Sequence, residues 1–331
     1  MSKLAIVIPA YKEIYFEKAL SSIAAQTCKD FTLYIGDDAS PNDLESIVEI
    51  FKDQIQIKYS RFNENIGSRN LVAQWERCID LVKDEEWIWL FSDDDLMEKN
   101  CVKNFYHAIS NYQDIDLFHF NPKIINHEDT IIGSFIFPDL LTIEEFFYGR
   151  SQLGYHSYVV EYIFRKSHFM AMGRFENFDL GWGSDDALWI KLGKRKGIKT
   201  IDEAKVFWRI SPYNISLNNQ DKKILKRKFY AKIEYSNWVI QQAKENNIHI
   251  DVNKIQQLLE YAFLNDLRFR SQNLSFKMIN DIVCRFYSSF NNSRFVKLKL
   301  MNFYFYKVYR LFVLSSKKIL FFDYGDIFSA F

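Results

Sequence analysis

The first hundred residues alternate short apolar runs with segments of helical spacing, and this order limits the fold more than any other feature of the chain. Fully apolar runs bounded by turn residues predict buried parallel strands, and apolar residues three or four positions apart predict helices. The alternation therefore predicts a parallel sheet with helices on both faces, joined by right-handed crossovers. The predicted strands are residues 4–8, 31–35, 55–59 and 87–91, and the predicted helices are residues 15–27, 43–51 and 69–82.

Acidic residues follow two of these predicted strands. Asp37 and Asp38 end the second strand, and Asp93, Asp94 and Asp95 follow the fourth. The carboxyl ends of such strands line one crevice, which is where open α/β sheets bind ligands. Three adjacent carboxylates repel one another, and a cation would relieve that repulsion. The alternative is a solvated acidic turn that caps the next helix.

Composition indicates a globular chain in a reducing compartment. The 331 residues are enough for one large domain or two ordinary ones. The four cysteines form no CxxC pair and no Cys/His cluster, which fits a cytosolic setting best. We expect no signal peptide and no membrane span, because the sequence lacks a long apolar leader and any run of eighteen uncharged apolar residues.

Charge is distributed unevenly along the chain. The net charge of +1 gives no overall signal for a nucleic-acid partner. Residues 217–331 carry 19 Lys and Arg against 9 Asp and Glu, whereas residues 1–216 carry 24 against 33. An acidic first part that would attract a cation therefore precedes a basic part that is rich in aromatic residues.

Five segments of the first part carry motifs. In order they are VIPAYKE, SSIAAQTCKDFTLYIGDDAS, NENIGSRN, LFSDDD and GRFENFDLGWGSDDALWIKLGKRKG. Together, from about residue 3 to residue 216, they resemble the family 2 glycosyltransferases with the GT-A fold. The resemblance implies an α/β catalytic domain over residues 1–216, with a Rossmann-like, mixed but mostly parallel sheet flanked by helices. Residues 217–331 then form a C-terminal α-helical extension.

The resemblance places a nucleotide-sugar donor, most simply a UDP-sugar, at the loops after the first strands. Asp38 can accept a hydrogen bond from a base N–H, or alternatively serve a turn or a helix N-cap. Family members often have Arg-x-His after a later strand, but this chain has Arg209 and then Ser211, so no histidine ligand is assumed. Arg209, with Tyr213 or Asn214, is predicted to bind the diphosphate instead. The predicted donor-binding residues are Pro9, Ala10, Tyr11, Glu13, Asp38, Asn65, Gly67, Arg69, Asp93, Asp94 and Arg209.

The acid triplet cannot contact a diphosphate directly, because both carry negative charge. Mn²⁺ or Mg²⁺ between them would bind carboxylate oxygens on one side and phosphate oxygens on the other. By resemblance Asp95 is the direct metal ligand, and Asp93 acts through water or the donor ribose. The cation would stabilise the departing diphosphate as a Lewis acid.

Asp185 and Asp186 lie where family members carry Glu-Asp, just before a predicted helix over residues 187–192. Attack by a sugar hydroxyl needs a base within reach of its proton. By resemblance Asp186 is this base and Asp185, one methylene shorter than the usual Glu, contacts the acceptor. Trp182 could stack on an acceptor sugar, or pack in the core. Helix capping is the structural alternative for both acids.

The resemblance, together with these residues, implies a metal-dependent, inverting glycosyltransferase that moves a sugar to a hydroxyl of a glycan or lipid-linked acceptor in surface polysaccharide synthesis. One alternative is a sugar-nucleotide-binding module without transferase activity. Another is a sugar-nucleotide pyrophosphorylase, which would need a Gly-rich loop after the first strand, whereas residues 9–13 contain no glycine. A dinucleotide-dependent dehydrogenase is excluded, because no GxGxxG follows an early strand.

The basic second part is predicted to be helical. Residues 222–247 have the pattern of one long amphipathic helix, and residues 294–322 mix Lys and Arg with large aromatics. This part either packs on the catalytic domain or forms a peripheral surface on the inner face of the membrane. Its charge also suits nucleic acid, but the motifs of residues 1–216 do not, so no nucleic-acid partner is predicted.

Overall fold

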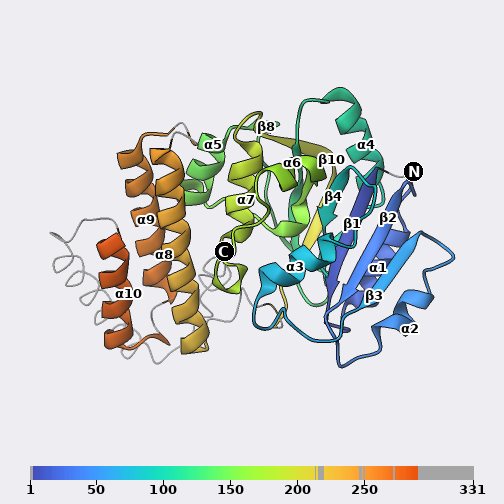
Figure 1. Cartoon of the computed structure of the whole chain (residues 1–331), viewed down its shortest axis with the longest axis horizontal. Helices are drawn as coiled ribbons and strands as arrows, with labels where there is room; N and C mark the ends of the chain where they lie inside the picture. Colours follow the sequence, from blue (N-terminus) through green and yellow to red (C-terminus); the bar gives the residue numbers. More distant parts are fainter. Residues whose placement is uncertain are drawn as a thin grey trace. The chain divides into compact units, whose positions relative to one another are not determined.

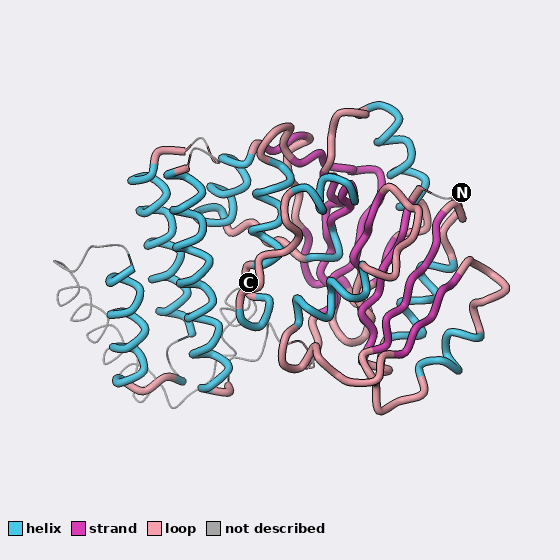
Figure 2. The backbone as a smooth tube through the Cα atoms, viewed as in Figure 1, coloured by secondary structure: helices cyan, strands magenta, loops and turns pink. Residues whose placement is uncertain are grey.

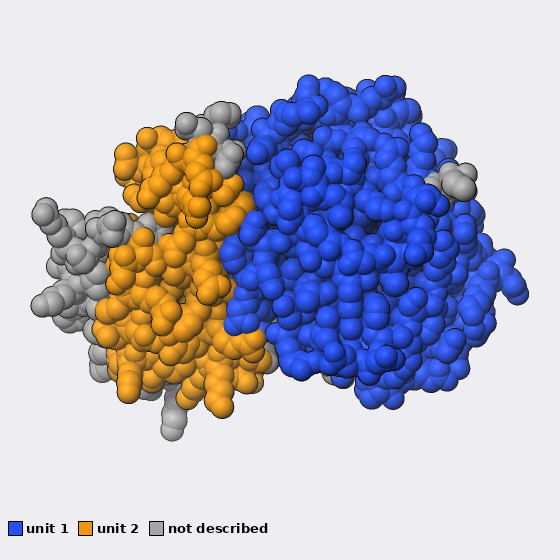
Figure 3. Space-filling model, in the orientation of Figure 1, with its two compact units in different colours: residues 1–147, 156–211 blue, residues 148–155, 212–331 orange. Residues whose placement is uncertain are grey.

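The computed structural model describes residues 3–212, 214, 220–245, 248, 250–270 and 273–289. Contacts divide the chain into two compact units, coloured in Figure 3. Unit 1 comprises residues 1–147 and 156–211, and unit 2 comprises residues 148–155 and 212–331.

Unit 1 is built on one mixed sheet, whose strands lie side by side in Figure 2. Its main path has the order β3-β2-β1-β4-β9-β6-β10-β5, with β7 paired to β6 and β8 paired to β10. Strands β3, β2, β1 and β4 are mutually parallel, and β9 is antiparallel to both β4 and β6. The strands are β1 (Leu4–Ala10), β2 (Phe31–Asp37), β3 (Ile57–Arg61), β4 (Trp87–Leu90), β5 (Leu96–Met97), β6 (Leu117–Ile125), β7 (Ile131–Ser134), β8 (Leu140–Leu141), β9 (Tyr162–Arg165) and β10 (Ile198–Arg209).

Helices cover both faces of this sheet, with α3 in front of β1 and α1 behind the strands in Figure 1. The helix α3 begins where Asn70 accepts a hydrogen bond from the amide of Ala73 at 3.0 Å, which satisfies one of the free amides of the first turn. The helices of unit 1 are α1 (Phe16–Ala24), α2 (Leu44–Glu49), α3 (Leu71–Ile79), α4 (Cys101–Asn111), α5 (Ile143–Tyr148, whose last residue belongs to unit 2), α6 (Lys166–Ala171) and α7 (Ser184–Gly193), with short turns η2 (Val159–Glu161) and η3 (Asp179–Gly181).

The strand register brings the predicted acidic loops together. Ala10, the last residue of β1, pairs with Asp37 on β2, and Val7 pairs with Leu90 on β4. Because these strands are parallel, the chain leaves all three at the same edge of the sheet. The acid triplet after β4 therefore runs beside the loop that follows β1.

The predicted strands and helices of the first hundred residues are confirmed, with ends shifted by a few residues. One alternative is wrong: the acid triplet is not a solvated cap of the next helix. Its three side chains are buried, the two-residue strand β5 follows them, and α4 begins only at Cys101 after its N-cap residue Asn100. A short strand after charged residues has no periodicity of its own, so the sequence could not predict it.

Unit 2 contains three α-helices among its described residues, α8 (Lys222–Lys244), α9 (Val252–Arg270) and α10 (Phe276–Ser289), and a short π-helix, η1 (Gly149–Leu153). Phe263 and Phe286 stack at 3.9 Å between ring centroids in its apolar core. The long helix predicted from residue 222 is confirmed. The aromatic cluster predicted within residues 294–322 lies outside the described residues, as does Tyr213. None of the described helices is long and apolar enough to cross a membrane.

Candidate active site

Asp93 ties the acid triplet to the loop after β1. One carboxylate oxygen, Oδ2, accepts hydrogen bonds from the backbone amides of Tyr11 at 2.9 Å and Lys12 at 2.8 Å. The Ser40 hydroxyl donates to the carbonyl of Tyr11 at 2.8 Å, which joins the loop after β2 to the same place. The side chains of Asp93 and Ser40 thus hold together three loops from three strand ends.

Lys12 supplies a positive charge inside this cluster. Its ammonium nitrogen lies 3.2 Å from Asp93 Oδ1 and forms a closer ion pair with Asp94. Burial by itself lowers the pKa of Lys12, but the charges of Asp93 and Asp94 outweigh it, so the pKa lies above its ordinary value. Burial raises the pKa of Asp94, and the charge of Lys12 opposes that rise. Lys12 therefore remains a cation and partly neutralises the triplet.

Asp95 is the most deeply buried acid of the three, at 1% exposure. Its Oδ1 accepts a hydrogen bond from the backbone amide of Arg209 at 2.7 Å. Burial, and then the charge of Asp94, raises the pKa of Asp95 well above its usual value, and the Arg209 amide offsets this only in part. Asp95 is the acid that gains most from a cation nearby.

The Arg209 guanidinium ties the acid loop to the turn after β6. Its Nε donates to the carbonyl of Asp94 at 2.7 Å, and its Nη1 donates to the carbonyl of Asn126 at 3.0 Å and pairs with Asp129. The guanidinium also lies over the ring of Tyr15, 4.2 Å from its centroid. Because Arg209 is fully buried, the structure gives it a scaffold role, and its predicted contact with a diphosphate stays a prediction.

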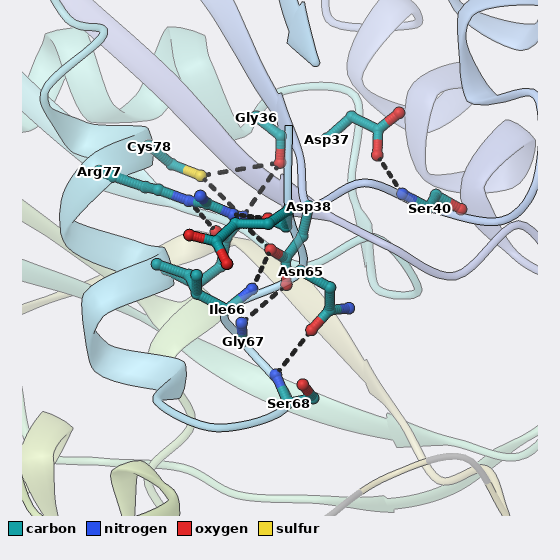
Figure 4. Close-up of polar contacts among 12 residues, drawn as sticks. Gly36, Asp37, Asp38, Ser40, Asn65, Ile66, Gly67, Ser68, Arg77 and Cys78 are labelled. Atoms are coloured by element: carbon teal, nitrogen blue, oxygen red, sulfur yellow. Dashed lines mark hydrogen bonds and ion pairs between the residues drawn. The ribbon is translucent and has the colours of Figure 1, made fainter. Parts of the chain in front are cut away.

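Asp38 holds the loop before α3, as Figure 4 shows. Its Oδ1 accepts from the amide of Ile66 at 2.8 Å, and its Oδ2 accepts from the amide of Gly67 at 2.9 Å. Arg77 of α3 forms an ion pair with the same carboxylate. A Cβ on Gly67 would lie 2.6 Å from Asp38 Oδ2, so a larger residue there would push this carboxylate away from the loop amides. Asp38 is 3% exposed, and its predicted contact with a base stays a prediction.

The neighbouring Asp37 also has a structural role, because its carboxylate binds groups of the surrounding strands and loop. Its carboxylate accepts from the amide of Ser40 at 2.7 Å and pairs with Arg61 at 2.6 Å. The Tyr59 hydroxyl donates to it as well. Burial and the charge of Asp37 raise the pKa of Tyr59, so this hydroxyl stays a donor. Asp37 therefore shapes the end of β2.

The other predicted donor residues differ in accessibility. Ala10 is buried at the end of β1, while Tyr11 and Glu13 are exposed in the loop that follows. Arg69 pairs with Glu64 at 2.8 Å at the surface. A groove of about 800 Å³ opens beside this loop and is lined partly by Glu13 and the α1 residues after it. The remaining two are Pro9, partly buried in β1, and Asn65, whose side chain accepts from the amide of Ser68 at 3.1 Å.

Asp185 and Asp186 lie in the first turn of α7, because the helix begins at Ser184, three residues before its predicted start. The N-cap of α7 is Gly183 in the left-handed region, with φ of 88°, so neither acid is the capping residue. Asp186 is buried at 7% exposure, and Asp185 and Trp182 are half-buried. The negative charges at a helix N-terminus are favourable with respect to its dipole. The roles of the three residues toward an acceptor stay predictions.

A divalent cation fits the chemistry of the triplet with one condition. Carboxylate oxygens are the donors that Mg²⁺ and Mn²⁺ prefer. Among the residues that the structure describes, however, no three His, Cys, Asp or Glu side chains converge to hold a metal alone. Mg²⁺ is commonly bound by one or two carboxylates, with water and substrate phosphates completing its shell. Asp93 and Asp95 fit that mode, provided that water molecules, or phosphate oxygens when a donor is bound, complete the site.

Sequence reasoning missed two residues of this region. Lys12 stands inside the quoted motif VIPAYKE, yet no role was given to it. Arg77 lies 39 residues after its partner Asp38. The signal for Lys12 was available, because a cation in the loop after one parallel strand faces acids in the loop after its neighbour. Nothing in the local sequence of α3 indicates the partner of Arg77.

Residues 5–178, more than half of the chain, match the profile described as Glycosyl transferase family 2. A GalNAc(5)-diNAcBac-PP-undecaprenol beta-1,3-glucosyltransferase from Campylobacter jejuni is 32% identical over 104 residues, which are 29% of this chain and 31% of that protein. An uncharacterized glycosyltransferase from Rickettsia felis is 30% identical over 127 residues, 35% of this chain and 20% of that one. The chain thus spans less than a third of the length of these curated relatives.

Solved structures agree in fold. S. aureus TarS 1-349 in complex with UDP-GlcNAc superposes with a TM-score of 0.63 at 14% identity, covering 91% of this chain and 89% of that one. The same fragment in complex with UDP gives a TM-score of 0.58 at 14% identity, covering 96% and 93%. The GT-A architecture predicted from the sequence, with helices after the sheet domain, is confirmed.

Proposed function

The chain belongs to glycosyl transferase family 2, and we propose that it transfers a sugar from a UDP-sugar to a hydroxyl of a glycan or lipid-linked acceptor. The observation that carries the proposal is the shared edge of the sheet. There Asp93 fixes the loop after β1, Asp38 fixes the loop before α3, and both loops bear residues of the donor motifs. The UDP-GlcNAc bound to TarS supports a uridine nucleotide as the donor's carrier.

The proposed reaction is a single displacement. The acceptor hydroxyl oxygen attacks the anomeric carbon of the donor sugar as the bond from that carbon to the diphosphate oxygen breaks. Asp186 takes the hydroxyl proton, which general-base catalysis requires within hydrogen-bonding reach. One displacement from the opposite face inverts the anomeric configuration. Asp185 and Trp182 orient the acceptor beside this base.

We also propose that transfer depends on Mn²⁺ or Mg²⁺, held by Asp95 and Asp93. The ion supplies Lewis-acid stabilisation of the charge on the departing diphosphate. The supporting observation is the burial of three consecutive carboxylates, which the nearby cation Lys12 only partly neutralises. The chain's own part is to keep Asp95 fixed through the Arg209 amide and Asp93 through the two loop amides.

The proposed acceptor is supported by the similar proteins and not by the structure. The Campylobacter jejuni enzyme carries an undecaprenol-linked glycan in its name, which supports a lipid-linked acceptor and a role in surface polysaccharide synthesis here. Such acceptors sit at a membrane, so we propose a cytoplasmic protein in which the basic residues of 217–331 contact the inner face peripherally.

The test replaces Asp186 by Asn, which keeps the shape of the side chain and removes the proton acceptor. UDP release from UDP-GlcNAc is measured with candidate acceptors, and UDP affinity is measured by calorimetry. We expect kcat to fall by about 10²–10⁴-fold while UDP affinity stays unchanged. Asp185→Asn is the matched control, and we expect it to change the acceptor KM more than kcat.

Retention of more than about a tenth of wild-type turnover by Asp186→Asn would show that another group is the base. If the wild type binds UDP but releases none from any UDP-sugar, even by slow hydrolysis, the chain is a sugar-nucleotide-binding module. If it binds no UDP, the proposed donor is wrong.

A further inference from the structure

Lys12 contacts Asp93, one of the two acids proposed above to hold a divalent cation. Its ammonium nitrogen contacts carboxylate oxygens of both Asp93 and Asp94, which are nearly buried, while its own side chain remains 27% exposed. Its backbone amide is fixed separately, by Asp93 Oδ2 at 2.8 Å. The ammonium group can therefore leave the acids by rotation of its four-carbon stem, without movement of the loop.

The charges of the cluster explain why the lysine is needed and why it must move. Two of the three buried carboxylates, Asp93 and Asp94, contact the Lys12 ammonium. The Arg209 guanidinium adds a second positive charge near Asp94, although it also donates to backbone carbonyls and pairs with Asp129. A divalent cation that binds Asp93 would need the oxygen that Lys12 now contacts. Asp93 Oδ2 already accepts two backbone amides, so both cations would have to share Oδ1, where their mutual repulsion disfavours the ammonium.

We propose that Lys12 is an exchangeable counter-ion of the acid triplet, which a divalent cation displaces and which then binds the diphosphate of the donor. This inference rests on the proposed function, because it needs a nucleoside diphosphate and a cation at the triplet. Lysine suits the role, since it is a compact charge on a flexible stem with three rotatable donors. In the absence of the cation it limits repulsion between the acids. In its presence the lysine adds positive charge beside the phosphates.

The first measurement is the affinity for Mn²⁺ alone, titrated by electron paramagnetic resonance without nucleotide. Lys12→Gln removes the competing charge, so we expect Mn²⁺ to bind at least about fivefold more tightly, the lower end of usual coupling between sites. Lys12→Arg keeps the charge and should keep the wild-type affinity. Lys18→Gln is the matched control, because Lys18 follows in the same segment but pairs with Asp129 at 2.6 Å. Asp95→Ala should lose Mn²⁺ binding.

The second measurement follows the lysine itself in the wild-type protein. Acetylation of Lys12 by an amine-reactive ester is quantified by mass spectrometry, with Lys18 as the internal reference. We expect slow labelling in EDTA, faster labelling with Mn²⁺, and slow labelling again when UDP is added to the Mn²⁺-bound protein. This order of protection distinguishes displacement from a general loosening of the loop.

The proposal is overturned if Lys12→Gln binds Mn²⁺ no more tightly than the wild type, or if Mn²⁺ leaves the labelling of Lys12 unchanged. UDP affinity in the same samples separates this failure from failure of the proposed function. If UDP binds but Lys12→Gln has the same Mn²⁺ affinity as the wild type, only the proposed displacement of Lys12 is rejected. Absence of UDP binding in every sample rejects the donor assignment itself.

Discussion

Replacement of Arg209 by Lys tests whether this residue is a scaffold or a donor ligand. The substitution keeps the positive charge but removes the planar fork. In the wild type, Nε donates to the carbonyl of Asp94 at 2.7 Å while Nη1 donates to that of Asn126 at 3.0 Å and pairs with Asp129. An ammonium group cannot reach both carbonyls in the geometry of the guanidinium.

The expected loss follows from these contacts. At least one buried carbonyl is left without its donor, which costs about 1–3 kcal/mol, and a hydrogen bond from a charged group is worth about 1.5–3 kcal/mol. Asp129 is partly exposed and keeps its ion pair with Lys18, so weakening of its ion pair with Arg209 adds little to the loss of stability. We expect the free energy of unfolding to fall by about 3 kcal/mol, with UDP affinity reduced only as far as the acid loop shifts.

Urea unfolding, monitored by tryptophan fluorescence, measures the difference in free energy of unfolding between the variant and the wild type. UDP affinity is measured without urea, where both proteins are folded. Arg61→Lys is the control, because Arg61 also pairs with a buried acid, Asp37, but its own side chain is 47% exposed. Because the Arg61 guanidinium remains in contact with water, which weakens its interactions, the control should lose less. An Arg209→Lys protein as stable as the wild type, with UDP binding lost, would refute the scaffold role and support the donor contact predicted from the sequence.

Two further predictions concern residues 217–331. Burial, and then the charge of Arg270, lowers the pKa of Lys228 to about 7, so the unfolded chain holds this proton more tightly than the folded one. The wild-type free energy of unfolding should therefore rise by about 2 kcal/mol relative to Lys228→Met between pH 7 and pH 9, and parallel urea-unfolding results at the two pH values would contradict this. If the basic residues of 217–331 bind a membrane surface, the full chain should sediment with anionic vesicles at low salt, less at high salt, and not with neutral vesicles. Equal and negligible sedimentation in all conditions would assign this part to packing.

The sheet of unit 1 was predictable where a strand's burial in the fold leaves a recognisable pattern in its own sequence. Strands β1, β2 and β4 are buried on both faces, so their sequences are continuous apolar runs that a reader can find without a structure. The shared edge of the parallel strands then follows from topology alone. This is why the acid triplet and the acids after β2 could be placed in one crevice from sequence.

Strand β9 shows where this reasoning stops. Tyr162–Arg165 enters the sheet antiparallel between β4 and β6, which are separated from it by some forty to seventy residues of chain. The pairing is set by the space between two distant strands, and a four-residue apolar run does not encode it. Register of this kind needs the folded partner, and so the mixed character of the sheet came from the family resemblance instead.

The site shows the same limit at the level of single side chains. The sequence identifies Asp38 and Asp93 as acids at strand ends, but their carboxylates bind loop amides 28 and 82 residues away. A carboxylate that fixes a loop and one that contacts a ligand have the same local sequence. Loss of activity in Asp38→Ala or Asp93→Ala would therefore reflect a displaced loop as readily as a lost donor contact. Lys12 and Asp186 are the better probes, because exchange of a flexible ammonium and removal of one proton acceptor change the chemistry while these backbone hydrogen bonds remain.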